Sequence, residues 1–377
     1  MKWFGRKAGR ALARPGLARG VAIGEWPRSY EAQVREGYCL NAIAQRAVRM
    51  VAEGVGSAPL TASDPGLAAL VRARSSGQVL TETVAAHLLL HGNAYVQLLG
   101  DGLGGVGELF ALRPERVAVE ADANGWPVAY RYRVAERVVR IAAEDEGGRP
   151  QIVHLKGFHP LDDHYGLGCL GAAAGAIAIH NAAAKWNKAL LDNAARPSGA
   201  LVHESPDGSV LSSDQFERLR EEMEAGFAGA ANAGRPMLLE GGLKWQAMSL
   251  TPADMDFVGL KAAAAREIAL AFGVPPMLLG LPGDNSYANY REANRAVWRQ
   301  TILPLAGSVL ASLEQALRGW DAGAALAVDV DRIAALAEDR ERLWAQVSAA
   351  DFLSDPEKRA MLGVVATTDT ASSAGGR

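Results

Sequence analysis

The sequence predicts an α+β fold in which two long helices carry a small unit away from a larger base. Short β-type runs, punctuated by DG, NG and GG pairs, fill residues 93–155. Two Ala-rich segments without breakers, 171–194 and 253–272, follow later in the chain. Between them, residues 197–249 have the turn-rich pattern of a separate unit. Two helices that flank such an insertion predict a stalk.

The composition is that of an ordinary soluble protein with two or three domains. The chain has 377 residues, 49% of them hydrophobic and 21% charged. A net charge of -3 argues against a global basic field for nucleic acid. Cys39 and Cys169 have no paired spacing, so no disulfide framework is expected. Residues 165–184 are uncharged but poor in large aliphatic side chains, which favours close helix packing over a membrane span.

Residues 1–28 are interpreted as a basic flexible arm, which lacks the apolar core of a secretory signal. The arm could move freely or could contact nucleic acid or an acidic partner. Its first twenty residues contain no acid and six cations: Lys2, Arg6, Lys7, Arg10, Arg14 and Arg19.

The base is predicted to begin with two helices. The first spans 38–53, with one apolar face and a stop at Gly54 and Gly56. The second is capped by Thr81 and ends at Gly92. Six strands are expected to follow as hairpins within a domain of roughly residues 29–160. The helical face comprises Leu40, Ile43, Ala47 and Val51, and the strands lie in 93–99, 106–114, 116–120, 126–134, 137–142 and 151–155.

The first long helix should extend to Pro197, and Thr251-Pro252 should open the second. The unit between them is expected to hold a strand in 199–204, a helix from Ser213 and a hairpin in 235–250. A further helical stretch, Tyr290–Arg318, is expected to be interrupted by Pro304. Charged helical residues follow Asp331, and the tail has a disordered composition.

Three patterns resemble catalytic or metal motifs but lack the required context. GDGLGG at 100–105 matches a dinucleotide-binding loop, yet a strand-like run follows it, which favours a hairpin. His87 and His91 lack the acid of a zinc-protease motif. His154, His159 and His164 recur every five residues, which fits a polar surface loop better than a metal site. We therefore expect neither an enzyme nor a bound cofactor.

Other stretches together resemble the bacteriophage portal protein family, which forms the ring at the capsid vertex through which DNA passes. They occur in collinear order along most of the chain. The resembling stretches are 39–53, 57–60, 91–99, 108–119, 153–168, 193–201, 233–245 and 272–304.

The resemblance implies a portal fold with an α/β wing, a two-helix stem, a small α/β clip and a short helical crown. Because the chain is short for the family, it would suit a small siphophage or a gene transfer agent. The implied divisions are arm 1–28, wing 29–165, stem helix 166–196, clip 197–249, second stem helix 250–275, tunnel loop 276–290, channel helix 291–328, crown 329–365 and disordered tail 366–377.

The resemblance also implies a ring of usually twelve subunits, which passes double-stranded DNA without sequence specificity. The implied partners are the terminase, head–tail connector or adaptor proteins and the major capsid protein, with no membrane. The location would be the portal vertex of a virion or virus-like particle, assembled in the host cytoplasm.

The tunnel loop is expected to project into the channel and to touch passing DNA. A connection of about 15 residues exceeds what a helix pair normally needs. Residues 275–290 contain no Lys or Arg, which suits sliding of a duplex, because each phosphate contact binds. The expected channel residues are Leu279, Gly280, Gly283, Asp284, Asn285, Ser286, Tyr287 and Asn289.

Residues 203–224 contain seven acids against two arginines, which is typical either of a docking surface or of a solvated helix face. The expected docking residues are Glu217, Glu221, Glu222 and Glu224. Two other classes of protein compete with the channel. One is a nucleotide-cofactor enzyme that uses Gly100–Gly105. The other is a sequence-specific DNA-binding protein, which the acidic pI of about 6.2 argues against.

Overall fold

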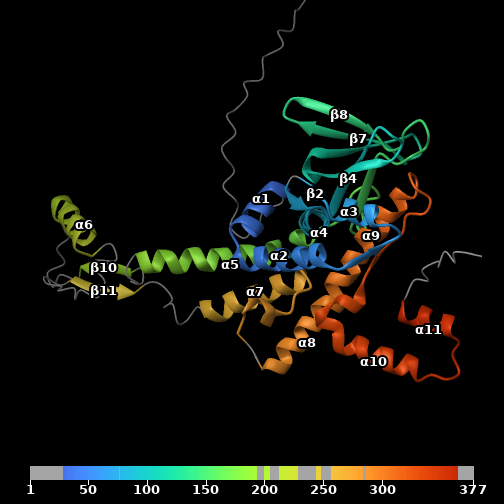
Figure 1. Ribbon diagram of the computed structural model, residues 1–377. Coiled ribbons are helices and arrows are strands. Elements are labelled where there is room, and N and C mark those ends of the chain that lie inside the picture. The colour runs from blue at the N-terminus through green and yellow to red at the C-terminus, as the bar shows by residue number, and fades with distance from the viewer. Residues whose placement is uncertain are drawn as a thin grey trace, which may run out of the picture.

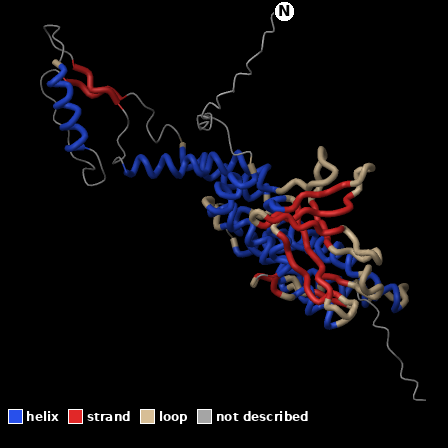
Figure 2. Tube along the Cα trace, turned by 90° about the horizontal axis from the view of Figure 1, so that it is seen from above, coloured by secondary structure: helices blue, strands red, loops and turns tan. Residues whose placement is uncertain are grey.

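A computed structural model describes residues 29–75, 77–192, 199–203, 212–227, 243–247, 256–282 and 286–363. A base of sheets and helices lies at one end of the molecule, and α5 (Cys169–Asp192) projects from it (Figure 1). The strands β10 and β11 and the helix α6 lie beyond the outer end of α5 (Figures 1 and 2). The helix α7 (Phe257–Ala271) packs along α5.

The remaining helices surround the sheets or follow α7. They are α1 (Tyr30–Val34), α2 (Ala42–Ser57), α3 (Pro65–Arg72), α4 (Leu80–His91), α6 (Ser213–Phe227), α8 (Tyr287–Val297), α9 (Leu303–Leu317), α10 (Ala337–Ser348) and α11 (Asp355–Leu362). The strands are β1 (Leu60–Ala62), β2 (Arg74–Ser75), β3 (Gln78–Val79), β4 (Asn93–Gly100), β5 (Val106–Leu112), β6 (Val117–Ala121), β7 (Pro127–Val134), β8 (Arg137–Ala142), β9 (Ile152–Lys156), β10 (Gly199–His203), β11 (Leu243–Ala247) and β12 (Leu326–Val328).

All six predicted strands of the base are present, as β4 to β9. They form two antiparallel three-stranded sheets, in the orders β5-β4-β9 and β6-β7-β8. The fully buried Tyr95 joins the sheets, because it packs with Tyr130 and Ile141 of the second sheet. The sequence did not indicate the short pair β1–β12, in which Leu60 lies opposite Val328.

The first helix of the base differs from its prediction at both ends. Asn41 caps α2, since its Oδ1 accepts hydrogen bonds from the amides of Ile43 and Ala44. Leu40 therefore precedes the helix and is exposed. Gly54 lies within the helix and does not stop it. A Cβ at Gly54 would lie 2.6 Å from Cδ1 of Ile302, so this glycine permits a close helix contact.

The second helix, α4, begins at Leu80, with Thr81 inside the helix and not at its cap. The predicted cap was wrong, because Thr81 is buried within the first turn. Gly92 ends the helix as predicted, with a left-handed φ of 81°.

Pro304 does not interrupt the third helical stretch. A π-helical turn, Trp298–Ile302, joins α8 to α9 and places Pro304 in the first turn of α9. The Leu303 N–H bonds to the carbonyl of Trp298, five residues back, and this wider turn accommodates the proline ring inside the helix. Residues 287–317 therefore form one continuous rod.

The core of the base has two main parts. In the first core cluster, α2, α5, α7 and the π-helical turn meet around Val48, Ile177 and Ile268. In the second core cluster, α3, α4 and α9 cover the sheet β5-β4-β9. Of the helices that the structure describes, none combines the length and apolar character that a membrane crossing requires.

Candidate functional site

The pair α5–α7 is anchored in the base by buried asparagines. Asn41 Nδ2 donates to Asn181 Oδ1 at 2.9 Å, and Asn181 Nδ2 donates to the carbonyl of Glu36 at 2.9 Å. Asn93 Oδ1 accepts from the amide of Gly166, three residues before α5 begins. Because buried amides without partners are costly, these bonds fix where α5 leaves the base. No local pattern in the sequence marks the contacts of these three asparagines.

Small side chains let α5 and α7 approach each other closely. Ala173 and Ala174 of α5 and Ala264 and Ala265 of α7 are all buried within the chain. These residues belong to two alanine runs, 172–174 of α5 and 262–265 of α7. The structure divides each run, so that only part of it faces outward. Ala172 and Ala263 are exposed.

The outward faces of the pair carry large apolar side chains among charged ones such as Lys185 and Arg266. On α5, Ile179 and Trp186 are 42% and 47% exposed. On α7, Leu260 and Leu270 are 45% and 78% exposed. Exposed apolar side chains that recur along a helix face indicate a surface that meets another protein surface.

The loop that follows α7 begins with a fixed turn. Phe272 is buried, and Gly273 adopts a left-handed φ of 65°. Thr301 Oγ1 donates to the carbonyl of Gly273 at 2.7 Å, which ties the end of α7 to the π-helical turn. Gly273 therefore terminates α7 before Pro275 is reached.

The apolar half of the loop packs on the base. Pro276–Leu279 form a 3-10 turn, and Leu278 and Leu279 lie against the first core cluster. Gly280 ends the turn with a φ of 73°. Arg266 Nη2 donates to the carbonyl of Pro282 at 2.9 Å, so α7 also holds the far side of the turn.

The loop returns to helix at Ser286, whose Oγ accepts from the amide of Asn289 and caps α8. Tyr287 is 82% exposed, and Tyr290 is also exposed. Of the predicted channel residues, the structure thus places Leu279, Gly280, Ser286, Tyr287 and Asn289 around one loop. Gly283, Asp284 and Asn285 lie outside the described residues.

Three arginines follow the loop on one side of the continuous rod, and each is ion-paired. Arg291 Nη1 lies 2.9 Å from Glu338 Oε1, and Arg295 Nη2 lies 2.8 Å from Glu338 Oε2. Arg299 Nη1 lies 3.8 Å from Asp339 Oδ2. The acids at the start of α10 therefore offset positive charge that would otherwise adjoin the loop.

The strands β10 and β11 and the acidic helix α6 form the outer unit. The helix α6 starts where Ser212 and Gln215 form a reciprocal cap. The Ser212 amide donates to Gln215 Oε1, and the Gln215 amide donates to Ser212 Oγ. Glu217 and Glu221 are exposed. Glu217 pairs with Arg220 at 2.8 Å. The side chains of Glu222 and Glu224 lie outside the described residues. The first strand of the hairpin predicted in 235–250 also lies outside them. Its second strand, β11, pairs with β10.

The glycine-rich loop lacks the geometry of a dinucleotide site. It joins the antiparallel strands β4 and β5, and no helix follows it. The carboxylate of Asp101 accepts from the amides of Leu103 and Gly105, which are therefore not available to a phosphate. Within the described ranges, no three His, Cys, Asp or Glu side chains are grouped to hold a metal ion. His154 is not in the expected surface loop, because it lies in β9 and stacks on the buried Tyr95.

Comparison with known proteins agrees with this architecture. The family described as phage portal protein matches residues 42–363. A Rickettsia felis protein of uncharacterised role is 38% identical over 357 residues, 87% of this chain and 88% of its own length. A chain in the neck of a native gene transfer agent particle, computed with C12 symmetry, is 48% identical. That alignment covers 92% of this chain and 97% of the other, with a TM-score of 0.69.

A more distant structure shares the fold alone. It is a phage portal protein of the HK97 family from Corynebacterium diphtheriae, at 18% identity and a TM-score of 0.57. The alignment covers 82% of this chain and 99% of that one. This chain belongs to the phage portal protein family, as the sequence analysis predicted.

Proposed function

We propose that this chain assembles into a closed ring of twelve subunits at the vertex of a virus-like particle and passes double-stranded DNA through its centre. The observation that carries the proposal is the 48% identity to a chain in a particle neck with C12 symmetry. At this identity over nearly the whole length, a ring of the same symmetry is the expected assembly. The particle could be a phage or a gene transfer agent.

The pair α5–α7 has surfaces that suit a head-to-tail ring. A closed ring needs two different faces that complement each other. The exposed side of α5 has the small residues Gly171 and Ala172 near its start, with Ile179 and Trp186 farther along. The exposed side of α7 carries the larger Leu260 and Leu270. Large side chains of one subunit would fit between small ones of the next.

Negative-stain electron microscopy of the purified protein tests the ring. We expect closed rings with a central hole, and Ala172→Asp should disrupt them because it places a charge at a small, apolar position on the outward face of α5. Ala345→Asp, at an exposed position of α10, is the matched control and should leave rings intact. A protein that stays monomeric by light scattering at high concentration, and shows no rings in particles, would contradict the proposal.

The loop at 276–290 is proposed to face the channel and to touch DNA weakly. Arginines at Asp284, Asn285 and Tyr287 would add ~36 cations around the duplex in a twelve-subunit ring, each able to contact a phosphate. Tyr287 is chosen over Ser286 because Ser286 caps α8. We expect normal rings but slower DNA packaging and ejection, with partial rescue at higher salt.

Arginines at Ala123, Glu136 and Asp351, which are exposed elsewhere, provide the control and should not change the rate of DNA movement. Particles of the loop variant that fill and empty at the wild-type rate would show that the loop does not meet DNA.

The outer unit, with α6, is proposed to bind the terminase during packaging and the head–tail connectors afterwards, while the base contacts the major capsid protein. Lysines at Glu217 and Glu221 reverse charge at two exposed positions of α6. Rings should form normally, and terminase or connector binding should weaken. The proposal includes no catalytic step and no cofactor. Its competitor, a nucleotide-dependent enzyme, predicts stoichiometric nucleotide binding.

A further inference from the structure

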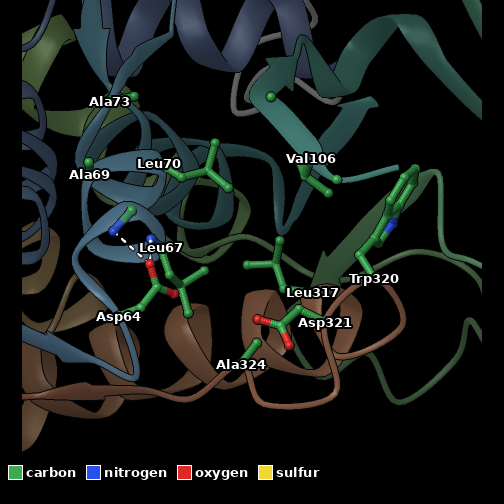
Figure 3. Close-up of a pocket in the computed structure, with 13 residues that line it drawn as sticks. Asp64, Leu67, Ala69, Leu70, Ala73, Val106, Leu317, Trp320, Asp321 and Ala324 are labelled. Carbon is green, nitrogen blue, oxygen red and sulfur yellow. Dashed lines mark hydrogen bonds between the residues drawn. The ribbon is translucent and has the colours of Figure 1, made fainter. Parts of the chain in front are cut away.

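An open apolar pocket lies in the base, away from α5, α7 and the 276–290 loop. Its volume is about 520 Å³, within the range of binding pockets in general. Leu67 and Leu70 of α3 line one side, and Leu317 comes from the end of α9. Val106 and Trp320 line the opposite side (Figure 3). Nothing in the channel role proposed above uses this pocket.

The walls of the pocket are fixed. Leu67 and Leu317 belong to the second core cluster. Trp320 is held in place because its Nε1 donates to the carbonyl of Pro150 at 2.8 Å. Arg149 stacks on its ring, with Cζ 4.4 Å from the ring centroid. A preformed apolar pocket binds an apolar side chain without first paying to order its own walls.

The charge at the pocket is negative. Asp64 Oδ1 accepts from the amides of Gly66 and Leu67, and Asp321 Oδ1 accepts from the amide of Gly323. The second oxygen of each carboxylate has no hydrogen bond or ion pair with any residue that the structure describes. None of the residues that line the pocket is Lys, Arg or His. The pocket therefore suits a segment with apolar side chains between cations.

The chain itself carries such a segment. Lys2-Trp3-Phe4-Gly5-Arg6-Lys7 places two adjacent aromatic side chains between three cations. It precedes the region that the portal family matches, which begins at residue 42.

The length of the chain before Ser29 limits how far the segment can reach. Phe4 lies 25 residues before Ser29, where the described chain begins. A chain of that length spans at most ~80–90 Å when fully extended. The proposal requires the pocket, in the same subunit or in an adjacent one, to lie within that span of Ser29.

We propose that the segment Lys2–Lys7 docks in this pocket, with Trp3 or Phe4 against the apolar walls and its cations beside Asp64 and Asp321. Docking would fasten the N-terminal arm to the base and, across a subunit boundary, would link neighbouring copies. The proposal rests on the apolar lining, the two carboxylates and the composition of the segment.

Disulfide trapping in the full-length chain tests the proposal. With Cys39→Ser and Cys169→Ser as background, Gly5→Cys is combined with Ala69→Cys, at an exposed position that lines the pocket. The matched control combines Gly5→Cys with Ala345→Cys, at an exposed position of α10. Under mild oxidation we expect the pocket pair to cross-link at least tenfold faster. A non-reducing gel then separates links within a chain from links between chains, and either supports docking.

Two further variants of the pocket pair test the chemistry. Trp3→Ala with Phe4→Ala should slow cross-linking about tenfold. Asp64→Asn with Asp321→Asn should slow it severalfold at low salt, because the amides keep the backbone hydrogen bonds but lose the charge. Glu136→Gln with Asp351→Asn removes two exposed charges outside the pocket and should have no effect.

Equal rates for the pocket and control pairs would overturn the proposal. So would a pocket pair whose rate is unchanged both by the aromatic substitutions and by the two Asp→Asn changes. Either result would leave the pocket to a different partner.

Discussion

The two ends of the α5–α7 pair differ in how they are held. At the inner end, Ile177 and Phe272 are buried in the core, and Asn181 is bonded to Asn41. At the outer end, Trp186 stacks on Phe257 with ring centroids 6.0 Å apart, and Trp186 is half-exposed. The difference indicates that the base stabilises the inner end within one chain, whereas in the proposed ring neighbouring copies would cover the outer end.

The largest expected effect is at the inner end. Phe272→Ala removes a fully buried ring from the first core cluster and should lower the free energy of unfolding by about 3–5 kcal/mol. Denaturant unfolding at concentrations where single subunits dominate measures it. Leu270→Ala, two residues away and 78% exposed, is the control and should change stability by less than about 0.5 kcal/mol. Similar losses for the two variants would contradict the comparison.

Acid should loosen the inner end as well. Burial lowers the pKa of His87 and of His154 to about 4, and His154 Nε2 donates to Asn93, which holds Gly166 ahead of α5. Both folded pKa values lie below the ordinary value of 6.5. Stability is therefore full above pH 6.5 and is lost as the pH falls from 6.5 toward 4, by about 3 kcal/mol per histidine.

Urea unfolding at pH 7 and at pH 4.5 measures this loss. His87→Leu should reduce the acid sensitivity, because the side chain cannot gain a proton. His159→Gln, in the loop before α5, should leave it unchanged. A His87→Leu variant that is as acid-sensitive as the parent would show that His87 does not contribute.

A smaller effect is expected at the turn that ends α7. Gly273→Ala would place an alanine at a left-handed φ, with its Cβ only 2.7 Å from Thr301 Oγ1. It should lower the free energy of unfolding by about 1–3 kcal/mol. Gly280→Ala has a similar φ of 73° but open space around it, so only the backbone strain remains. Thermal unfolding of the two variants separates the steric contact from the strain. Equal losses would mean that the Thr301 contact adds nothing.

The smallest effect on stability is expected at the outer end. Trp186→Ala should change the unfolding free energy of a single subunit by less than about 1 kcal/mol, because the ring is half-exposed. Assembly into rings should nevertheless weaken, since the substitution removes apolar surface from the outward face. Analytical ultracentrifugation measures the assembly. A large loss of subunit stability with normal rings would reverse the comparison.

Local sequence patterns predicted the strands and the first long helix well, but the second begins at Phe257, capped by Asp256, and is not opened by Thr251-Pro252. Alternation and turn residues marked β4 to β9, and the unbroken Ala-rich run marked α5. The buried side of α5 could not be predicted, because alanines surround the helix and leave no polar face to orient it. Asn41 had the position of a helix cap, but its bond to Asn181 joins residues 140 positions apart. Pro304 was misread because the π-helical turn before it has no simple sequence pattern.

The same limit applies to the candidate site. The composition of 275–290 identified a loop without Lys or Arg. It did not show that Arg266 binds the carbonyl of Pro282, or that Glu338 and Asp339 neutralise the arginines of the following helix. These contacts depend on how α7 and α10 pack, which no local pattern encodes.

The continuous rod of residues 287–317 has a mechanical consequence. At 1.5 Å per residue it is about 46 Å long, and it starts at the exposed Tyr287 and ends at Leu317 in the wall of the apolar pocket. A push on its first turn is not absorbed locally, because a helix is stiff along its axis. The widened π-helical turn between its two halves is the natural fulcrum. We therefore expect a load on the first turn of the rod to be transmitted along it toward the wall of the pocket.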